Sequence, residues 1–178
     1  MTISLRLPSR DDDARLVFDA LTDMRAVLAV RPESPTVTMA QLYRLATDPQ
    51  HDDAALEVQL AENPALRVRF QTLLERTALY ALPKLAAASS REVTTREGRG
   101  YRIRLQPSQA ESTQTYIIFE FDDTAQTAPR TVFVCRADRA PLRHRLPDAI
   151  GGVVQLLVDS ESDLLRGLRD LDAEVFLR

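Results

Sequence analysis

The sequence predicts an α+β protein in which about four N-terminal helices pack with a C-terminal, mainly antiparallel sheet of five to six strands plus one short helix. Three observations lead to this prediction. Apolar residues recur with a helical period as far as residue 85, the period changes to two from Tyr101 onward, and the strand-like runs follow one another at hairpin-like spacing. Each part presents one apolar stripe or face, so we expect the two parts to share a core.

The overall composition is that of a globular intracellular protein. The chain has 178 residues, of which 44% are hydrophobic and 28% are charged, and its net charge of -3 draws it to neither nucleic acid nor membrane. The single cysteine, Cys135, cannot form an internal disulfide. There is no secretory signal and no apolar run of about 20 residues. We therefore expect a cytoplasmic protein without membrane contact.

The first expected elements are a short strand and a helix. Residues 2–7 alternate between apolar and polar side chains, which is typical of a strand. The acidic turn Asp11 to Asp13 suits the positive end of a helix dipole, and an apolar stripe follows it. Pro32 and Pro35 end this helix, because the residue before a proline resists the helical conformation.

Capping residues predict the starts of two further helices. Thr38 and Gln41 have the spacing of a capping box, in which each side chain bonds the other's backbone N–H. The next helix is expected to begin near Asp52 or Asp53, and an apolar stripe continues from there.

The fourth helix has the strongest start signal. Asn63 is a favoured N-cap, and Pro64 at the first helical position loses no hydrogen bond. The apolar stripe that follows extends to Leu85, and Pro83 is expected to kink or end the helix.

A change of composition separates two parts of the chain. Alanine and serine, then mixed charges and glycines, occupy residues 86–100, which we interpret as a linker. The expected division is a helical part at 1–88 and a β-rich part at 96–178.

The β-rich part contains alternating or continuous apolar runs bounded by turn residues. Strands are predicted at 101–105, 116–121, 131–135, 142–146 and 153–158. Ser160 is expected to cap a short helix with Asp163 in the capping-box position, and residues 174–177 are a candidate last strand.

Residue types that carry chemistry are scarce. His51 lies beside Asp52 and Asp53, but no second histidine is near in sequence, and acidic residues are expected at a helix start. His144 lies within a predicted strand. Cys135 ends a run that is apolar on both strand faces, so we expect it to be buried and unreactive.

No motif for catalysis or cofactor binding is present. Gly98 and Gly100 lack the third glycine of a dinucleotide loop, Gly151-Gly152 lacks the lysine of a phosphate loop, and no esterase elbow occurs. The sequence thus favours a protein that is not an enzyme, with no catalytic residue, no metal and no cofactor.

Arginines on the predicted sheet are the strongest candidate binding residues. Alternation places Arg102 with Arg104, and Arg143 with Arg145, opposite apolar neighbours. Guanidinium groups on one sheet face suit an acidic partner or a phosphate-rich ligand. The alternative is that Glu120, on a neighbouring strand, pairs across with them.

Residues 60–70, Leu-Ala-Glu-Asn-Pro-Ala-Leu-Arg-Val-Arg-Phe, are similar to the helix–Asn/Asp-Pro–helix segment of cytoplasmic helical domains in bacterial anti-sigma regulators. The zinc-binding His-x-x-x-Cys-x-x-Cys signature of one such group is missing, and no transmembrane helix follows. The resemblance implies a soluble regulator of a sigma factor or of transcription.

Two functions from different classes follow. The first is a non-catalytic regulatory or protein-interaction module that engages a protein partner through Arg102, Arg104, Arg143 and Arg145. The alternative is a small-molecule-binding β-domain, with or without enzymatic activity, whose pocket lies between the sheet and the helices. A deep pocket with inward polar groups would favour the second function, and a shallow apolar or charged surface would favour the first.

Overall fold

The structure is a computed structural model that describes residues 37–84, 93–122 and 128–178. Contacts between residues divide the chain into two compact units, Met1–Val37 and Thr38–Arg178, and all the elements named below belong to the second. The strand predicted at residues 2–7 and the helix predicted to follow it lie outside the described residues.

Three helices begin the described chain, and their starts follow the capping residues. They are α2 (Met39–Thr47), α3 (Ala54–Glu62) and α4 (Pro64–Thr77). The capping box of Thr38 and Gln41 is confirmed. The Asp53 side chain accepts from the Leu56 N–H, and the Asn63 side chain accepts from the Leu66 N–H, 3.1 Å away. Local hydrogen bonds therefore determine where these helices begin.

Helix α4 ends earlier than its apolar stripe predicts. Ala78 is its C-cap and is extended, with φ -64° and ψ 143°, so the helix does not continue to Leu85. The next residues form the short strand β1 (Tyr80–Leu82), which pairs antiparallel with β8 (Glu174–Leu177) at the end of the chain. A partner almost a hundred residues away in sequence thus overrides the local helical period.

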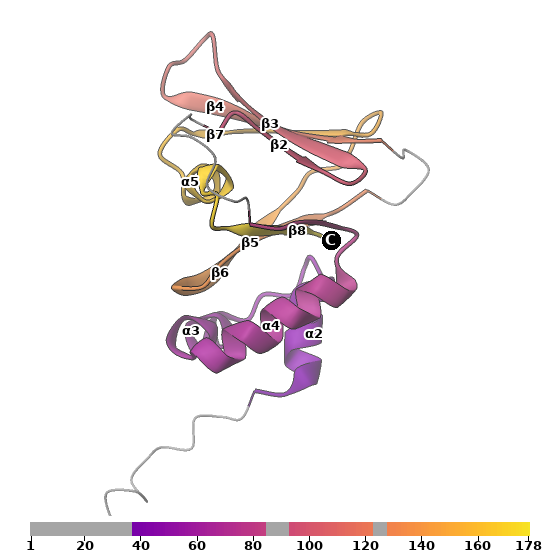
Figure 1. The fold of residues 1–178 in the computed structure, drawn as a ribbon, viewed down its shortest axis with the longest axis vertical. Helices are drawn as coiled ribbons and strands as arrows, with labels where there is room; N and C mark the ends of the chain where they lie inside the picture. Colours follow the sequence, from indigo (N-terminus) through magenta and orange to yellow (C-terminus); the bar gives the residue numbers. More distant parts are fainter. Residues whose placement is uncertain (1–36, 85–92, 123–127) are drawn as a thin grey trace, which may run out of the picture. The chain divides into compact units, whose positions relative to one another are not determined.

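The strands of the described residues form two antiparallel sheets of four strands each (Figure 1). In the order of their strands, sheet A is β1-β8-β5-β6 and sheet B is β2-β3-β4-β7. The remaining strands are β2 (Thr95–Gly98), β3 (Tyr101–Pro107), β4 (Gln114–Phe121), β5 (Thr131–Arg136), β6 (Arg139–Arg145) and β7 (Val153–Asp159).

The predicted arrangement, a helical bundle packed with one sheet of five to six strands, is wrong. The chain does mix helices and antiparallel strands, but β4 and β5 do not form the hairpin that their spacing favoured. Strand β4 pairs with β3 and β7, whereas β5 pairs with β6 and β8. Residues 122–130 therefore lead from one sheet to the other, and the strand spacing in the sequence does not distinguish a hairpin from such a crossing.

The segment interpreted as a linker contains a hairpin. Its residues 86–92 lie outside the described residues, and Thr95–Gly98 is strand β2, which pairs with β3. Gly100 in the turn has a φ of 83°, a conformation that side chains with a Cβ resist. Gly98 is needed for a different reason, because an added Cβ would lie 2.3 Å from the Tyr101 ring.

A core cluster joins the facing sides of the two sheets. Ile103, Ile117 and Phe119 of sheet B are fully buried in it together with Val132 and Val175 of sheet A. The short helix α5 (Asp163–Arg169) adds three leucines to this cluster. Its N-cap is Ser162 rather than Ser160, since the Ser162 hydroxyl accepts from the Leu165 N–H.

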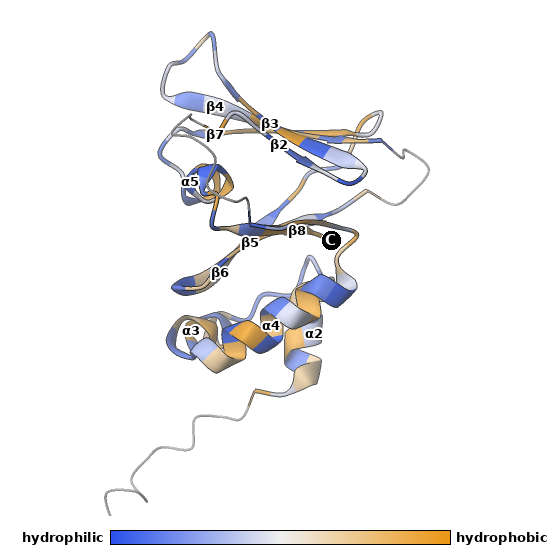
Figure 2. Cartoon of the chain, viewed as in Figure 1, coloured by the Kyte–Doolittle hydropathy of each residue, from blue (hydrophilic) through white to orange (hydrophobic). Residues whose placement is uncertain are grey.

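Sheet A is buried on its other face as well. Phe133 lies against Phe70 of α4 with ring centroids 5.7 Å apart, and the neighbouring strand adds buried Phe176 on the same side. Figure 2 shows hydrophobic residues both on α2 to α4 and along the strands. Every residue of β5 from Thr131 to Cys135 is accordingly buried, which explains why this run is apolar without alternation.

Among the helices within residues 37–84, 93–122 and 128–178, none combines the length and the apolar character needed to cross a membrane.

Candidate functional site

The four predicted arginines lie on two different sheets. Arg102 and Arg104 are on β3 of sheet B, and Arg143 and Arg145 are on β6 of sheet A. The structure therefore does not bring them together on one sheet face. Each pair has to be considered with its own surroundings.

Arg102 and Arg104 belong to the outer face of sheet B, the side that points away from the core. This face includes alternate residues of four strands: Thr95, Glu97, Arg102, Arg104, Gln106, Tyr116, Ile118, Glu120, Val153, Gln155 and Leu157. No described helix packs extensively on sheet B, so these side chains form an open, mixed apolar and charged surface.

Ion pairs organise the charged part of this face. Arg102 Nε lies 2.8 Å from Glu97 Oε1, and Arg104 Nη2 lies 3.1 Å from Glu120 Oε1. The cross-strand pairing with Glu120 that the sequence offered as an alternative is thus present. The two arginine side chains remain 51% and 46% exposed, so each still presents guanidinium donors to solvent.

Arg143 has a structural environment. Its guanidinium donates to the backbone carbonyls of His51 and Asp48, the latter at 2.6 Å, in the loop between α2 and α3. Burial lowers the pKa of the Arg143 guanidinium, although nearby carboxylates, first that of Glu57, oppose this effect. These bonds fasten the α2–α3 loop to the edge strand of sheet A, so Arg143 is largely occupied within the fold.

Arg145 and the two histidines line a shallow depression beside that loop. Its volume is about 380 Å³, and its walls are formed by Pro49, Gln50, His51, Asp52, Glu57, Arg143, His144 and Arg145. The Nε2 atom of His51 is 4.0 Å from the Asp53 carboxylate, and burial lowers the pKa of His144. Within the described residues no cluster of three or more His, Cys, Asp or Glu side chains could hold a metal ion.

An apolar cavity of about 170 Å³ lies between the helices and sheet A. It is lined by Leu45, Glu57, Leu60, Phe70, Phe133, Ala140, Pro141, Leu142 and Arg143. Ligand pockets for drug-sized molecules usually occupy about 300–1,000 Å³. This cavity is therefore large enough only for a ligand smaller than a drug-sized molecule.

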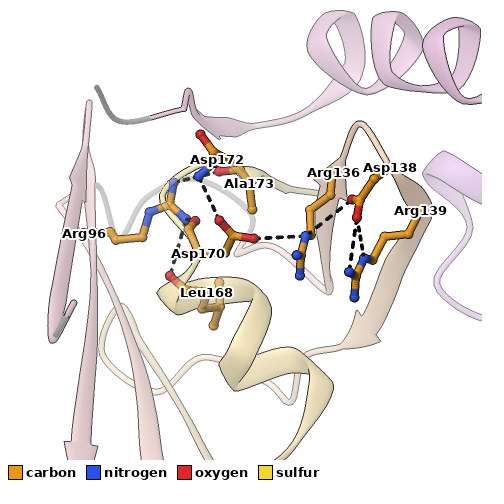
Figure 3. A network of polar contacts seen from close by, with 8 residues as sticks. All are labelled: Arg96, Arg136, Asp138, Arg139, Leu168, Asp170, Asp172 and Ala173. Carbon is orange, nitrogen blue, oxygen red and sulfur yellow. Dashed lines mark hydrogen bonds and ion pairs between the residues drawn. The ribbon is translucent and has the colours of Figure 1, made fainter. Parts of the chain in front are cut away.

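Among the described residues, the buried arginine is Arg96 on β2. It is 2% exposed, and its guanidinium donates to the carbonyls of Ala173 at 2.9 Å and Asp170 at 3.2 Å (Figure 3). Weaker bonds reach the carbonyls of Leu168 and Pro83, each at 3.4 Å. Arg96 thus joins β2 to the C-terminal end of α5 and to the approach to β8.

The side-chain carboxylate of Asp170 pairs with a different arginine, Arg136. Asp170 Oδ2 lies 3.0 Å from Arg136 Nε at the end of β5, and Asp138 links Arg136 to Arg139 in the β5–β6 turn (Figure 3). Arg96 is therefore held by backbone dipoles, and burial lowers the pKa of its guanidinium. No sequence signal distinguished it, because β2 is too short for its alternation to be recognised.

Cys135 is buried, as predicted, with an exposed fraction of 3%. Burial, with smaller contributions from the carboxylates of Glu174 and Glu75, raises the pKa of its thiol to about 12. At neutral pH the thiol is therefore protonated, and the thiolate that a nucleophile would need is absent.

Labelling of Cys135 by a thiol reagent is expected to be slow in the folded protein and to accelerate on unfolding. The thiol of the unfolded chain ionises near pH 8.5, roughly, whereas the native thiol keeps its proton to higher pH. Raising the pH above the pKa of the unfolded thiol therefore lowers the free energy of unfolding, because only the unfolded chain can release this proton. Native labelling should therefore increase far less from about pH 7 to about pH 9 than labelling of an exposed thiol, introduced as Thr95→Cys on β2. Rapid labelling of the native thiol would contradict this expectation and make Cys135 a candidate nucleophile.

Comparison with known proteins yields no relative: no protein-family model, no curated protein and no solved structure matches this chain.

Proposed function

We propose that this chain is a non-catalytic, cytoplasmic regulatory module that binds another protein through the outer face of sheet B. The observation that carries the proposal is that this face is open and mixes half-exposed arginines with the apolar side chains of Tyr116 and Ile118. Such mixed surfaces are typical of protein interfaces, whose centre is apolar and whose rim is polar.

The arginines set the expected chemistry of the partner. Arg102 and Arg104 each have an internal carboxylate neighbour, and an acidic partner would compete with or extend those ion pairs. The resemblance of residues 60–70 to bacterial anti-sigma regulators makes a sigma factor or another transcription regulator the partner class that we put forward. Arg145, on sheet A, is kept as a separate candidate contact.

The test begins with capture of partners from the source cells by the immobilised full chain, followed by their identification by mass spectrometry. The purified partner is then titrated against the wild-type chain and the Arg102→Ser/Arg104→Ser double variant at low and high salt. We expect the double variant to bind about tenfold or more weakly and with a flatter salt dependence. Its melting temperature should change little, because exposed ion pairs contribute about 0–1 kcal/mol.

A matched control is Arg166→Ser. Arg166 on α5 is also exposed and paired, with Nη2 2.7 Å from Asp163 Oδ1, but it does not belong to the outer face of sheet B. Its replacement should leave partner binding unchanged. Equal affinities for the wild-type chain, the double variant and this control would refute the proposed face.

A second candidate function rests on the 170 Å³ cavity between the helices and sheet A. Glu57 and Arg143 supply polar groups among the apolar walls of that cavity. Mass spectrometry of the purified protein under native conditions would detect a small molecule that remains bound. A bound compound lost on Phe70→Trp, which fills the cavity, would favour this function over protein binding.

A further inference from the structure

The two sheets have four edge strands, and three of them are protected from pairing with another chain. Strand β1 has three residues and β2 has four, and these two edges lie against one another. Strand β6 carries arginines and Pro141, which has no N–H to donate, and α3 and α5 pack against it. Short length, charge, proline and cover are the usual means by which proteins block edge pairing.

Within the part of the chain that the structure describes, the fourth edge, β7, has none of these protections. Its sequence is Val-Val-Gln-Leu-Leu-Val-Asp, with no proline and no charge before Asp159. Among the described elements it packs extensively only against β4, its neighbour in sheet B. A long, uncharged and uncovered edge strand is a template for addition of another strand.

The hydrogen bonds at the two ends of β7 show which backbone groups face the open edge. The Phe121 N–H donates to the Gly152 carbonyl and the Ser160 N–H donates to the Thr113 carbonyl. Because bonded pairs alternate in an antiparallel ladder, the even-numbered residues of β7 bond to β4 and the odd-numbered residues point outward. Val153 is already bonded to Ile150, which leaves Gln155 and Leu157 with unpaired N–H and C=O groups among the described residues.

Apolar side chains accompany these free backbone groups. Leu157 is 48% exposed, and Ile150, in the turn that leads into β7, is 85% exposed. On the inner side of the same edge, Leu156 and Val158 are only partly buried against the core cluster. A strand added here would cover apolar surface on both faces of the sheet.

We propose that β7 pairs antiparallel with β7 of a second copy of this chain, which would join the two sheets B into one continuous sheet. With Gln155 opposite Leu157 of the second copy, the outward N–H and C=O groups of both residues are satisfied in each copy. Leu156 then lies opposite Leu156 of the second copy, on the two-fold axis.

Charge favours a second copy as the occupant. In this register Asp159 lies opposite Val153 of the second copy, so no like charges face one another, and the paired residues between them are uncharged. Antiparallel pairing of β6 with β6 of a second copy would instead place the arginines of one copy near those of the other. The proposal concerns the backbone edge of sheet B, which adjoins the outer face that carries Arg102 and Arg104, and it does not depend on those arginines binding a partner.

Sedimentation of the full chain over a range of concentrations tests the proposal. We expect a concentration-dependent dimer for the wild-type chain and self-association weakened by roughly tenfold or more in Leu157→Lys and in Gln155→Pro. The Gln155 N–H points outward, so a proline there removes no bond to β4. Gln106→Lys, an exposed charge on the same sheet face but on β3, should leave the dimer unchanged, and circular dichroism confirms that each variant is folded.

Disulfide formation tests the register. The two copies of Leu156 would face each other on the two-fold axis as a non-hydrogen-bonded pair. In such a pair the two Cα atoms lie about 4.5 Å apart, which is within the range of a disulfide. Leu156→Cys should therefore form a covalent dimer on mild oxidation, whereas Val158→Cys should not, and the buried native thiol takes no part. A wild-type chain that is monomeric at all concentrations, or Leu157→Lys and Gln155→Pro variants that dimerise as tightly as wild type, would overturn the proposal.

Discussion

Replacing Arg96 by methionine is expected to lower the free energy of unfolding by about 3 kcal/mol. The guanidinium donates to the carbonyls of Ala173, Asp170, Leu168 and Pro83 in a buried environment. Methionine has similar length but no donor, and a buried acceptor left without a partner costs about 1–3 kcal/mol. The loss is moderated because removing the cation also removes the cost of burying it, which is the cost that lowers the pKa of Arg96.

Urea unfolding of the full chain measures this effect, with Arg99→Met as the matched control. Arg99 is exposed in the turn that follows β2, so its replacement should change stability by at most about 0.5 kcal/mol. The Arg96→Lys variant should also be less stable than wild type, because a single ammonium group cannot span carbonyls from separate segments. A loss below about 1 kcal/mol for Arg96→Met would show that these carbonyls find other partners.

Replacing Phe70 by alanine is expected to cost about 3–5 kcal/mol. Phe70 is fully buried, and its ring meets that of Phe133 edge-on, 5.7 Å away, where α4 packs on sheet A. The truncation would leave a cavity that adjoins the existing 170 Å³ space. Val68→Ala, on the same helix but 64% exposed, is the control and should change stability by about 0.5 kcal/mol or less.

The same variant tests whether the helices and the sheets share one core. Cys135 lies on the face of sheet A that carries Phe133, so loosening α4 should speed native thiol labelling of Cys135 as well as lower the unfolding midpoint. Helical and sheet signals should still be lost together in one transition. Two separate transitions would instead support a division into independent parts near residue 88.

Local interactions account for what could be predicted. The capping side chains of Thr38, Asp53 and Asn63 act on N–H groups within three residues, so their sequence pattern predicts the helix starts correctly. The change of period at Tyr101 likewise predicts β3, whose residues alternate between buried and exposed. The continuous apolar run that ends at Cys135 predicted burial of the thiol.

The candidate site was predictable only in part. Alternation correctly placed Arg102 and Arg104 opposite buried neighbours on β3, and the pairing with Glu120 was foreseen. Alternation also predicted that Arg143 lies opposite apolar neighbours. Its hydrogen-bond partners, however, belong to a loop more than ninety residues earlier in the chain. Neither the carbonyl partners of Arg96 nor the open backbone groups of β7 leave any trace in the local pattern.

The sequence by itself determined where α2, α3 and α4 begin, that the segments of β3 to β7 are extended and which side of β3 faces the core, because each depends on groups a few residues apart. Only the tertiary structure decided which strands pair. Strand β1 follows helix α4 and joins the last strand of the chain, and β4 and β5, consecutive in sequence, belong to different sheets. Backbone N–H and C=O groups are chemically the same in every strand, so partner choice depends on how whole apolar faces pack together. That packing also determines which edge of the sheets remains open.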